Sequence, residues 1–109
     1  ITFWSSHLLC KPPRTGRNVP WHQDAREWKN LRGNFGASVW IPFDDVDVDS
    51  GTMSIIPGWH RKGGLSQIPR GDERDDFYAD IDRAEFPANL DEIAVTYDLK
   101  AGQGAIHTS

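Results

Sequence analysis

Residues 37–43, Ala-Ser-Val-Trp-Ile-Pro-Phe, decide the fold class, because they form the clearest β-strand in the sequence. The segment is rich in β-branched and aromatic residues, which favour extended structure. Pro42 cannot donate a ladder hydrogen bond, so we expect a sheet edge or a bulge near the end of this strand. An acidic loop, residues 44–51, leads to a second expected strand, residues 53–56. The two strands together predict a hairpin.

Further strands are expected towards both ends of the chain. Residues 1–10 are rich in β-formers and predict a strand that ends at Lys11-Pro12-Pro13. Residues 93–99 and 104–107 predict two more strands, separated by a turn at Lys100-Ala101-Gly102. Strands at short spacings predict an all-β sandwich or barrel.

The segment between the hairpin and the last strands is charged and irregular. We expect residues 61–88 to lie over the sheet as a polar excursion outside the core, with a short helix within residues 72–79. The acidic run at residues 72–76 is typical of a solvated face or a helix start. The chain therefore contains one domain, or part of one, and no second core.

Composition narrows the functional classes. The chain has 109 residues, 38% of them hydrophobic and 11% aromatic, which favours a folded globular protein. A formal net charge of −4 gives no basic field for a phosphate backbone, so nucleic acid is not an expected partner. Cys10 is the single cysteine, which favours a reducing, cytoplasmic setting, and no apolar run predicts a membrane span or signal peptide. Both ends fall in expected strands, so we expect a domain truncated at both ends. Oligomeric state is not predicted.

The sequence Trp-His-Gln-Asp-Ala, residues 21–25, carries the strongest chemical signal. Residues 19–24 are expected to be extended, because Pro20 keeps its predecessor out of the helical region, and a short helical turn is expected over residues 25–31. In a strand, His22 and Asp24 would project from the same face and could offer a nitrogen and an oxygen to one metal ion. That is two-thirds of the 2-His-1-carboxylate triad that binds Fe(II). The pair alone is a weak signal, because a strand-end histidine and a surface acid give the same letters.

Several further motifs follow the pair in a fixed order. The ordered set is Lys11-Pro12-Pro13, His22-Gln23-Asp24, Trp40, Asp44-Asp45-Val46-Asp47 and Gly51-x-Met53-x-Ile55-Ile56-Pro57-Gly58-x-His60. This set resembles the phytanoyl-CoA dioxygenase family of Fe(II)/2-oxoglutarate-dependent oxygenases. The resemblance covers nearly the whole chain and is densest over residues 11–61. It implies an all-β, cupin-like double-stranded β-helix, or jelly roll, present here in part.

The resemblance also implies a ligand set. His22 and Asp24 match the first two iron ligands of the family, with 2-oxoglutarate and O₂ as cosubstrates. Trp40 matches an aromatic residue that lines the 2-oxoglutarate pocket, although a plain core tryptophan fits as well. Gln23 and His7 match positions near the cosubstrate, and a strand-surface histidine is the alternative for His7.

The third ligand and the arginine that pairs with 2-oxoglutarate are not apparent. Family members commonly have a histidine at the position of His107 and a second one a few residues later, which is the iron ligand. The resemblance therefore places the third ligand beyond Ser109, and we expect the chain alone to be inactive. His107 itself is the alternative, since a neighbouring strand can supply a ligand. Trp59 also departs from the family, which more often has a small hydroxyl residue there.

The resemblance implies hydroxylation of an unactivated C–H bond in a small organic substrate, with conversion of 2-oxoglutarate to succinate and CO₂. Asp24 favours hydroxylation over halogenation, because related halogenases have a small residue at that position. Trp28, Arg26 and Arg32 follow the ligands and are candidate substrate contacts, although a structural role suits Trp28 equally well.

Two other functions remain open. One is a non-catalytic β-sandwich module that binds carbohydrate through its tryptophans, and the other is a cupin-like metalloenzyme independent of 2-oxoglutarate. A calcium-binding loop at residues 45–56 is not expected, because Ser50 and Ile56 stand where glycine and glutamate are required.

Overall fold

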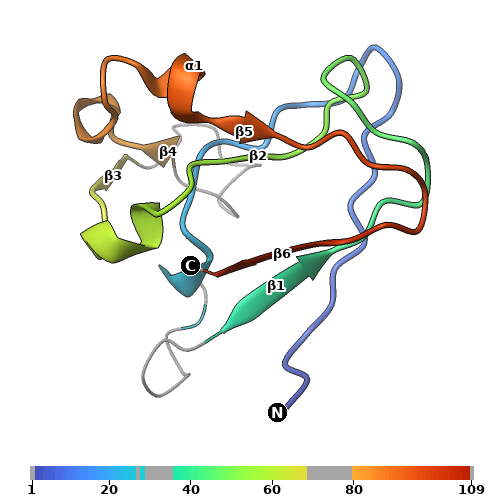
Figure 1. Cartoon of the computed structure of the whole chain (residues 1–109), viewed down its shortest axis with the longest axis horizontal. Coiled ribbons are helices and arrows are strands. Elements are labelled where there is room, and N and C mark those ends of the chain that lie inside the picture. The colour runs from blue at the N-terminus through green and yellow to red at the C-terminus, as the bar shows by residue number, and fades with distance from the viewer. Residues whose placement is uncertain (1, 27, 29–35, 69–79, 109) are drawn as a thin grey trace.

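The computed structural model describes residues 2–26, 28, 36–68 and 80–108, in which strands and loops dominate (Figure 1). Within these residues the strands form three two-stranded antiparallel sheets, and these sheets do not close into a barrel. The strands are β1 (Ala37–Trp40), β2 (Ser54–Ile55), β3 (Gln67–Ile68), β4 (Asp80–Ile81), β5 (Val95–Thr96) and β6 (Ala105–Thr108). The helical elements are the 3-10 turns η1 (Asp24–Arg26), η3 (Trp59–Lys62) and η4 (Arg83–Glu85), and the α-helix α1 (Leu90–Ile93).

The sheet formed by β1 and β6 has a partly buried inner face and an exposed outer face. Its register places Ser38 opposite His107 and Trp40 opposite Ala105. These four residues are partly buried, whereas Val39, which alternates with them along β1, is 60% exposed. Because side chains alternate between the faces of a strand, Ser38, Trp40 and His107 share the inner face.

The predicted hairpin between residues 37–43 and 53–56 is wrong. β1 pairs with β6, and β2 pairs with β5, so both strands take partners from the end of the chain. The pairing continues past β1, since the Pro42 carbonyl accepts a hydrogen bond from the Gly102 amide at 2.9 Å. Pro42 needs no donor in this position, which explains how it follows the strand directly.

Two other segments differ from the expected strands. Residues 2–10 are not in a strand, and Phe3 and Leu8 are 79% and 78% exposed, so their β-forming composition is not matched by a ladder partner within the described structure. Residues 19–23 are also irregular, and η1 begins at Asp24. His22 and Asp24 therefore do not lie in a strand. The helical turn expected at residues 25–31 is confirmed at its start by η1.

The buried apolar residues lie in the segment that was expected to be a polar excursion. Leu65 and Ile81 are the buried hydrophobic side chains of the described residues, at 8% and 6% exposure. β3 and β4 pair across this segment, and the Ile81 amide donates to the Trp21 carbonyl at 3.1 Å. The expectation that residues 61–88 stay outside the core is wrong. Leu65 and Ile81 belong to this segment and are buried, although the residues around them are mostly polar. The helix expected within residues 72–79 lies outside the described residues.

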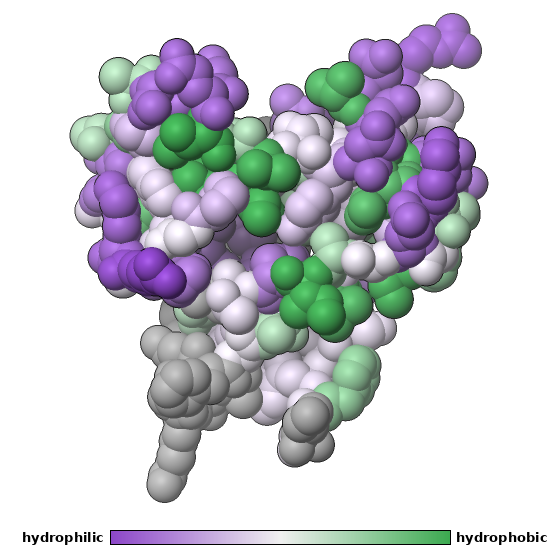
Figure 2. Space-filling model, viewed as in Figure 1, coloured by the Kyte–Doolittle hydropathy of each residue, from purple (hydrophilic) through white to green (hydrophobic). Residues whose placement is uncertain are grey.

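Much of the apolar surface remains accessible, as the hydrophobic patches of Figure 2 show. The exposed large hydrophobic residues include Val39 and Ile106 on the outer face of the β1–β6 sheet, and Phe43 and Val48 in the following loop. None of the helices in the described ranges has the length and apolar character needed to cross a membrane.

Candidate metal centre

His22 is oriented by its own backbone. Its Nδ1 lies 2.8 Å from the carbonyl oxygen of Pro20, which can only accept a hydrogen bond. The Nδ1 atom therefore carries a proton, and Nε2 is the ring nitrogen left to face Asp24. This Nε2 lies 3.2 Å from Oδ1 of Asp24. Histidines that bind metals commonly donate their other ring N–H to a carbonyl in this way, which fixes the tautomer and the ring orientation.

Asp24 is the centre of the polar cluster. Its Oδ2 accepts a hydrogen bond from the Ser38 hydroxyl at 2.6 Å and lies 3.2 Å from Nε2 of His107. The hydrogen bonds from His107 and His22 hold the pKa of the Asp24 carboxyl well below its ordinary value, and the bond from Ser38 lowers it further, against the opposing effect of burial. Asp24 is therefore a carboxylate at neutral pH.

His107 approaches the same carboxylate from β6 and has different surroundings from His22. Its Nδ1 is buried and has no hydrogen-bond partner. Since Asp24 is ionised and can only accept, Nε2 of His107 is the donor in this contact. In the neutral ring Nδ1 then carries the lone pair, without the carbonyl contact that orients His22.

The pair of His22 and Asp24 fits a metal ion on two grounds. Two ligands about 2.1 Å from one octahedral metal lie about 3 Å apart, close to the observed 3.2 Å between Nε2 and Oδ1. In addition, Nδ1 of His22 is held by the Pro20 carbonyl, which leaves Nε2 as the nitrogen that faces the carboxylate and can bind a metal ion. Their side chains are each 24% exposed, so solvent reaches them. In the part of the chain that the structure describes, no group of three or more His, Cys, Asp or Glu residues is arranged to hold a metal ion.

Trp40 and Gln23, both predicted to lie near the cosubstrate, have different surroundings in the structure. Trp40 lies on the inner face of β1 together with Ser38, and its ring centroid is 6.1 Å from that of Tyr97. Gln23 points away from the cluster. Its Nε2 donates to the Gly63 carbonyl and its Oε1 accepts from the Leu65 amide, both at 2.9 Å. The Gln23 amide thus ties the His22–Asp24 loop to a distant segment.

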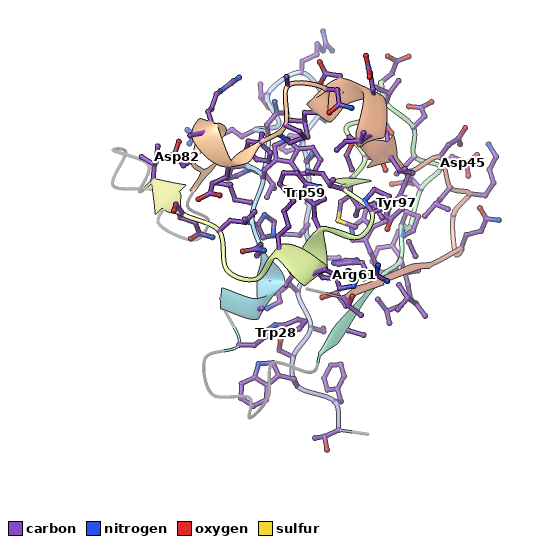
Figure 3. The ribbon with its side chains drawn as sticks, turned by 60° about the vertical axis from the view of Figure 1, so that its left-hand side comes forward. Trp28, Asp45, Trp59, Arg61, Asp82 and Tyr97 are labelled. Atoms are coloured by element: carbon purple, nitrogen blue, oxygen red, sulfur yellow. The ribbon has the colours of Figure 1, made fainter. Side chains whose placement is uncertain are left out.

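The predicted substrate residues are only partly described. The Trp28 ring packs against Gly36, where an added Cβ atom would lie 2.1 Å from a ring carbon. In Figure 3, Trp28 lies beside η1 and away from Trp59 and Tyr97. Arg32 and the Arg26 side chain lie outside the described residues. His7 is exposed in the irregular segment before residue 11.

Two residues of this region, Ser38 and Tyr97, were not among the predicted site residues. Ser38 reaches Asp24, Tyr97 packs against Trp40, and burial raises the pKa of the Tyr97 phenol. Strand alternation places Ser38 on the same face as Trp40, so the sequence contained a signal for it. Trp59, the departure from the family pattern, stacks on Phe86 with ring centroids 6.0 Å apart.

No curated protein and no solved structure matches the chain. The sequence model of the family Phytanoyl-CoA dioxygenase (PhyH) matches residues 1–108, and this family generally uses Fe(II) and 2-oxoglutarate. The chain therefore belongs to the phytanoyl-CoA dioxygenase family, a group of oxygenases.

Proposed function

We propose that the chain is part of an Fe(II)- and 2-oxoglutarate-dependent dioxygenase that hydroxylates an unactivated C–H bond of a small organic substrate. One O₂ supplies one oxygen atom to the substrate and one to succinate, and 2-oxoglutarate loses CO₂. The supporting observation is the 3.2 Å approach of His22 Nε2 to Asp24 Oδ1, with His22 already oriented by the Pro20 carbonyl. In this proposal the small sheets belong to a double-stranded β-helix.

The residues of the chain have distinct roles in this proposal. His22 offers the Nε2 lone pair and Asp24 offers Oδ1, whose negative charge lowers the net charge of the centre. Bound Fe(II) with 2-oxoglutarate supplies the oxidising power for C–H cleavage. Trp40 and Tyr97 form an aromatic wall beside the ligands, since their rings are in contact and Trp40 shares a face with Ser38. A carboxylate at residue 24 supports hydroxylation rather than halogenation.

The third ligand and the arginine for 2-oxoglutarate are assigned to sequence that follows Ser109. His107 is the alternative third ligand, because its Nε2 also reaches Asp24. Arg26, Arg32 and Trp28 remain proposed substrate contacts.

Anaerobic addition of Fe(II) and 2-oxoglutarate to the protein that contains this chain tests the proposal. We expect a visible metal-to-ligand charge-transfer band that is absent in His22→Ala and Asp24→Ala. His60→Ala is a matched control, because His60 is an exposed histidine on η3. Metal binding without a band on addition of 2-oxoglutarate would instead indicate a cupin-like metalloenzyme. Carbohydrate binding without any metal binding would indicate a non-catalytic module.

A further inference from the structure

We propose that Ser38 and His107 are positioning residues that hold Oδ2 of Asp24 away from the metal, so that Asp24 binds the metal through Oδ1 alone. This inference rests on the proposed metal centre at His22 and Asp24. It assigns a role to two residues on the inner face of the β1–β6 sheet.

The first support is that both residues contact the same oxygen atom. The Ser38 hydroxyl donates to Oδ2 at 2.6 Å, and His107 Nε2 lies 3.2 Å from Oδ2. The other carboxylate oxygen, Oδ1, faces His22. The two oxygens of Asp24 are thus distinguished by their surroundings, one towards the proposed metal and one towards the sheet.

The second support is the strand register. Ser38 and His107 are direct partners across the antiparallel pair of β1 and β6. Directly opposed side chains on one face lie about 4.5–5.5 Å apart at Cβ, close enough to bind one atom together. The contact to Asp24 is therefore fixed by backbone pairing rather than by a mobile loop. A shift of the register by one residue would turn both side chains to the other face.

The chemical consequence follows from the number of lone pairs. Each carboxylate oxygen offers about two acceptor sites, so two donors occupy those of Oδ2. A bidentate Asp24 would need Oδ2 as a metal ligand and would fill one more octahedral position. With a facial triad, three positions remain for the two oxygens of 2-oxoglutarate and for O₂. Holding Oδ2 on the sheet therefore keeps the position for O₂ open.

His107 fits the role of a donor better than that of a ligand. Its Nε2 is directed at the carboxylate, and its Nδ1 is buried without a partner. His22, in contrast, has Nδ1 fixed by a backbone carbonyl. The Ser38 hydroxyl shares the oxygen that His107 contacts, so the two side chains act on Asp24 in the same way.

Mn(II) binding to the protein that contains this chain tests the inference without measuring turnover. The metal affinity is measured by calorimetry, and the number of bound waters by water-proton relaxation. We expect Ser38→Ala to lower Mn(II) affinity about tenfold, as loss of a residue that orients a ligand does. Release of Oδ2 should also remove about one of three metal-bound waters, because Asp24 becomes bidentate. Ser38→Thr, which keeps the hydroxyl, should restore both values.

Two further variants complete the test. Ser54→Ala is the matched control, since Ser54 is a strand serine whose hydroxyl bonds to Thr96 at 2.8 Å, not to Asp24. His107→Gln retains a donor and should bind Mn(II) close to wild type, whereas His107→Leu should resemble Ser38→Ala. Equal water numbers and affinities in Ser38→Ala and Ser54→Ala would overturn the inference, as would complete loss of Mn(II) in His107→Gln, which would make His107 a ligand. Mn(II) binding that does not depend on His22 would overturn the metal centre itself.

Discussion

Two regions of this molecule are held together by different forces. The first, called the metal-centre corner, is the proposed metal centre around Asp24. The second, called the core corner, is the β3–β4 pair with the buried Leu65 and Ile81. At the metal centre, η1 and the β1–β6 sheet meet through hydrogen bonds among partly exposed polar side chains, with Asp24 at the centre. At the core corner, Leu65 and Ile81 are buried beside the β3–β4 pair. Hydrogen bonds to a carboxylate fix its position and depend on its charge, whereas apolar burial is the main source of folding free energy. Stability and metal binding should therefore respond to different substitutions.

The largest expected effect on stability is at the core corner. Ile81→Ala removes three methylene-sized groups from a site that is 6% exposed, and such changes destabilise by about 2–5 kcal/mol. Urea unfolding measures the loss. Val39→Ala is the control, because Val39 is a β-branched strand residue that is 60% exposed. If Val39→Ala cost as much as Ile81→Ala, the core would not lie where the structure places it.

The next effect concerns the tight packing beside the metal centre. Gly36→Ala would place a Cβ atom 2.1 Å from the Trp28 ring, so the indole must move. Overpacking of this kind costs about 1–3 kcal/mol. We expect a shift in tryptophan emission together with lower stability. Gly64→Ala is the control, since a Cβ atom there meets nothing within 4 Å. An unchanged emission spectrum in Gly36→Ala would contradict the Trp28 contact.

Gln23 joins the two corners, so its removal should affect both. Gln23→Ala deletes the two hydrogen bonds to residues 63 and 65, each worth about 0.5–1.5 kcal/mol. We expect a moderate fall in stability and weaker metal binding, because the loop that carries His22 and Asp24 loses its tether. Gln103→Ala is the control, since Gln103 accepts a single local hydrogen bond from the Lys100 amide. Unchanged metal affinity in Gln23→Ala would show that the corners are independent.

The sequence predicted local structure better than pairing. The strand at β1, the turn before β6 and β6 itself follow from composition and glycine or proline positions, and the structure confirms them. The hairpin was wrong because partners for β1 and β2 come from the far end of the chain, and no local pattern encodes a contact at that separation. The buried Leu65 and Ile81 were missed because each stands alone among polar residues, without periodicity.

The sequence predicted several residues of the cluster around Asp24 but not their arrangement. The spacing of His22 and Asp24 brought them together although neither lies in a strand, because η1 turns Asp24 towards the ring. His107 was named as an alternative ligand, and its proximity to Asp24 depends on the β1–β6 register. Ser38 could be reached only by combining strand alternation with that register. Gln23 bonds to the segment at residues 63–65, and its predicted place near the cosubstrate stays a prediction.

The smallest expected effect is at the surface ion pair of Asp45 and Lys100. Figure 3 shows Asp45 at the opposite side of the view from Asp82, which caps η4. Two partners lower the pKa of the Asp45 carboxyl. The larger effect comes from a hydrogen bond that the Ala101 amide donates, and the next from the Lys100 side chain, which lies 2.9 Å away. Both partners are well exposed, so solvent screens the interaction and its contribution to stability is small.

The sign of the pH dependence follows from this lowered pKa. A carboxyl that ionises more easily in the folded state stabilises that state above its unfolded pKa near 3.8, and the stabilisation is lost as pH falls through the folded pKa. Asp45→Asn should therefore lower the thermal midpoint slightly at pH 7 and have less effect on it once the pH falls below the folded pKa of Asp45. High salt should shrink the difference at pH 7. Asp44→Asn is the neighbouring control, and an equal shift in that variant would assign the effect to net charge rather than to the hydrogen bonds of Asp45.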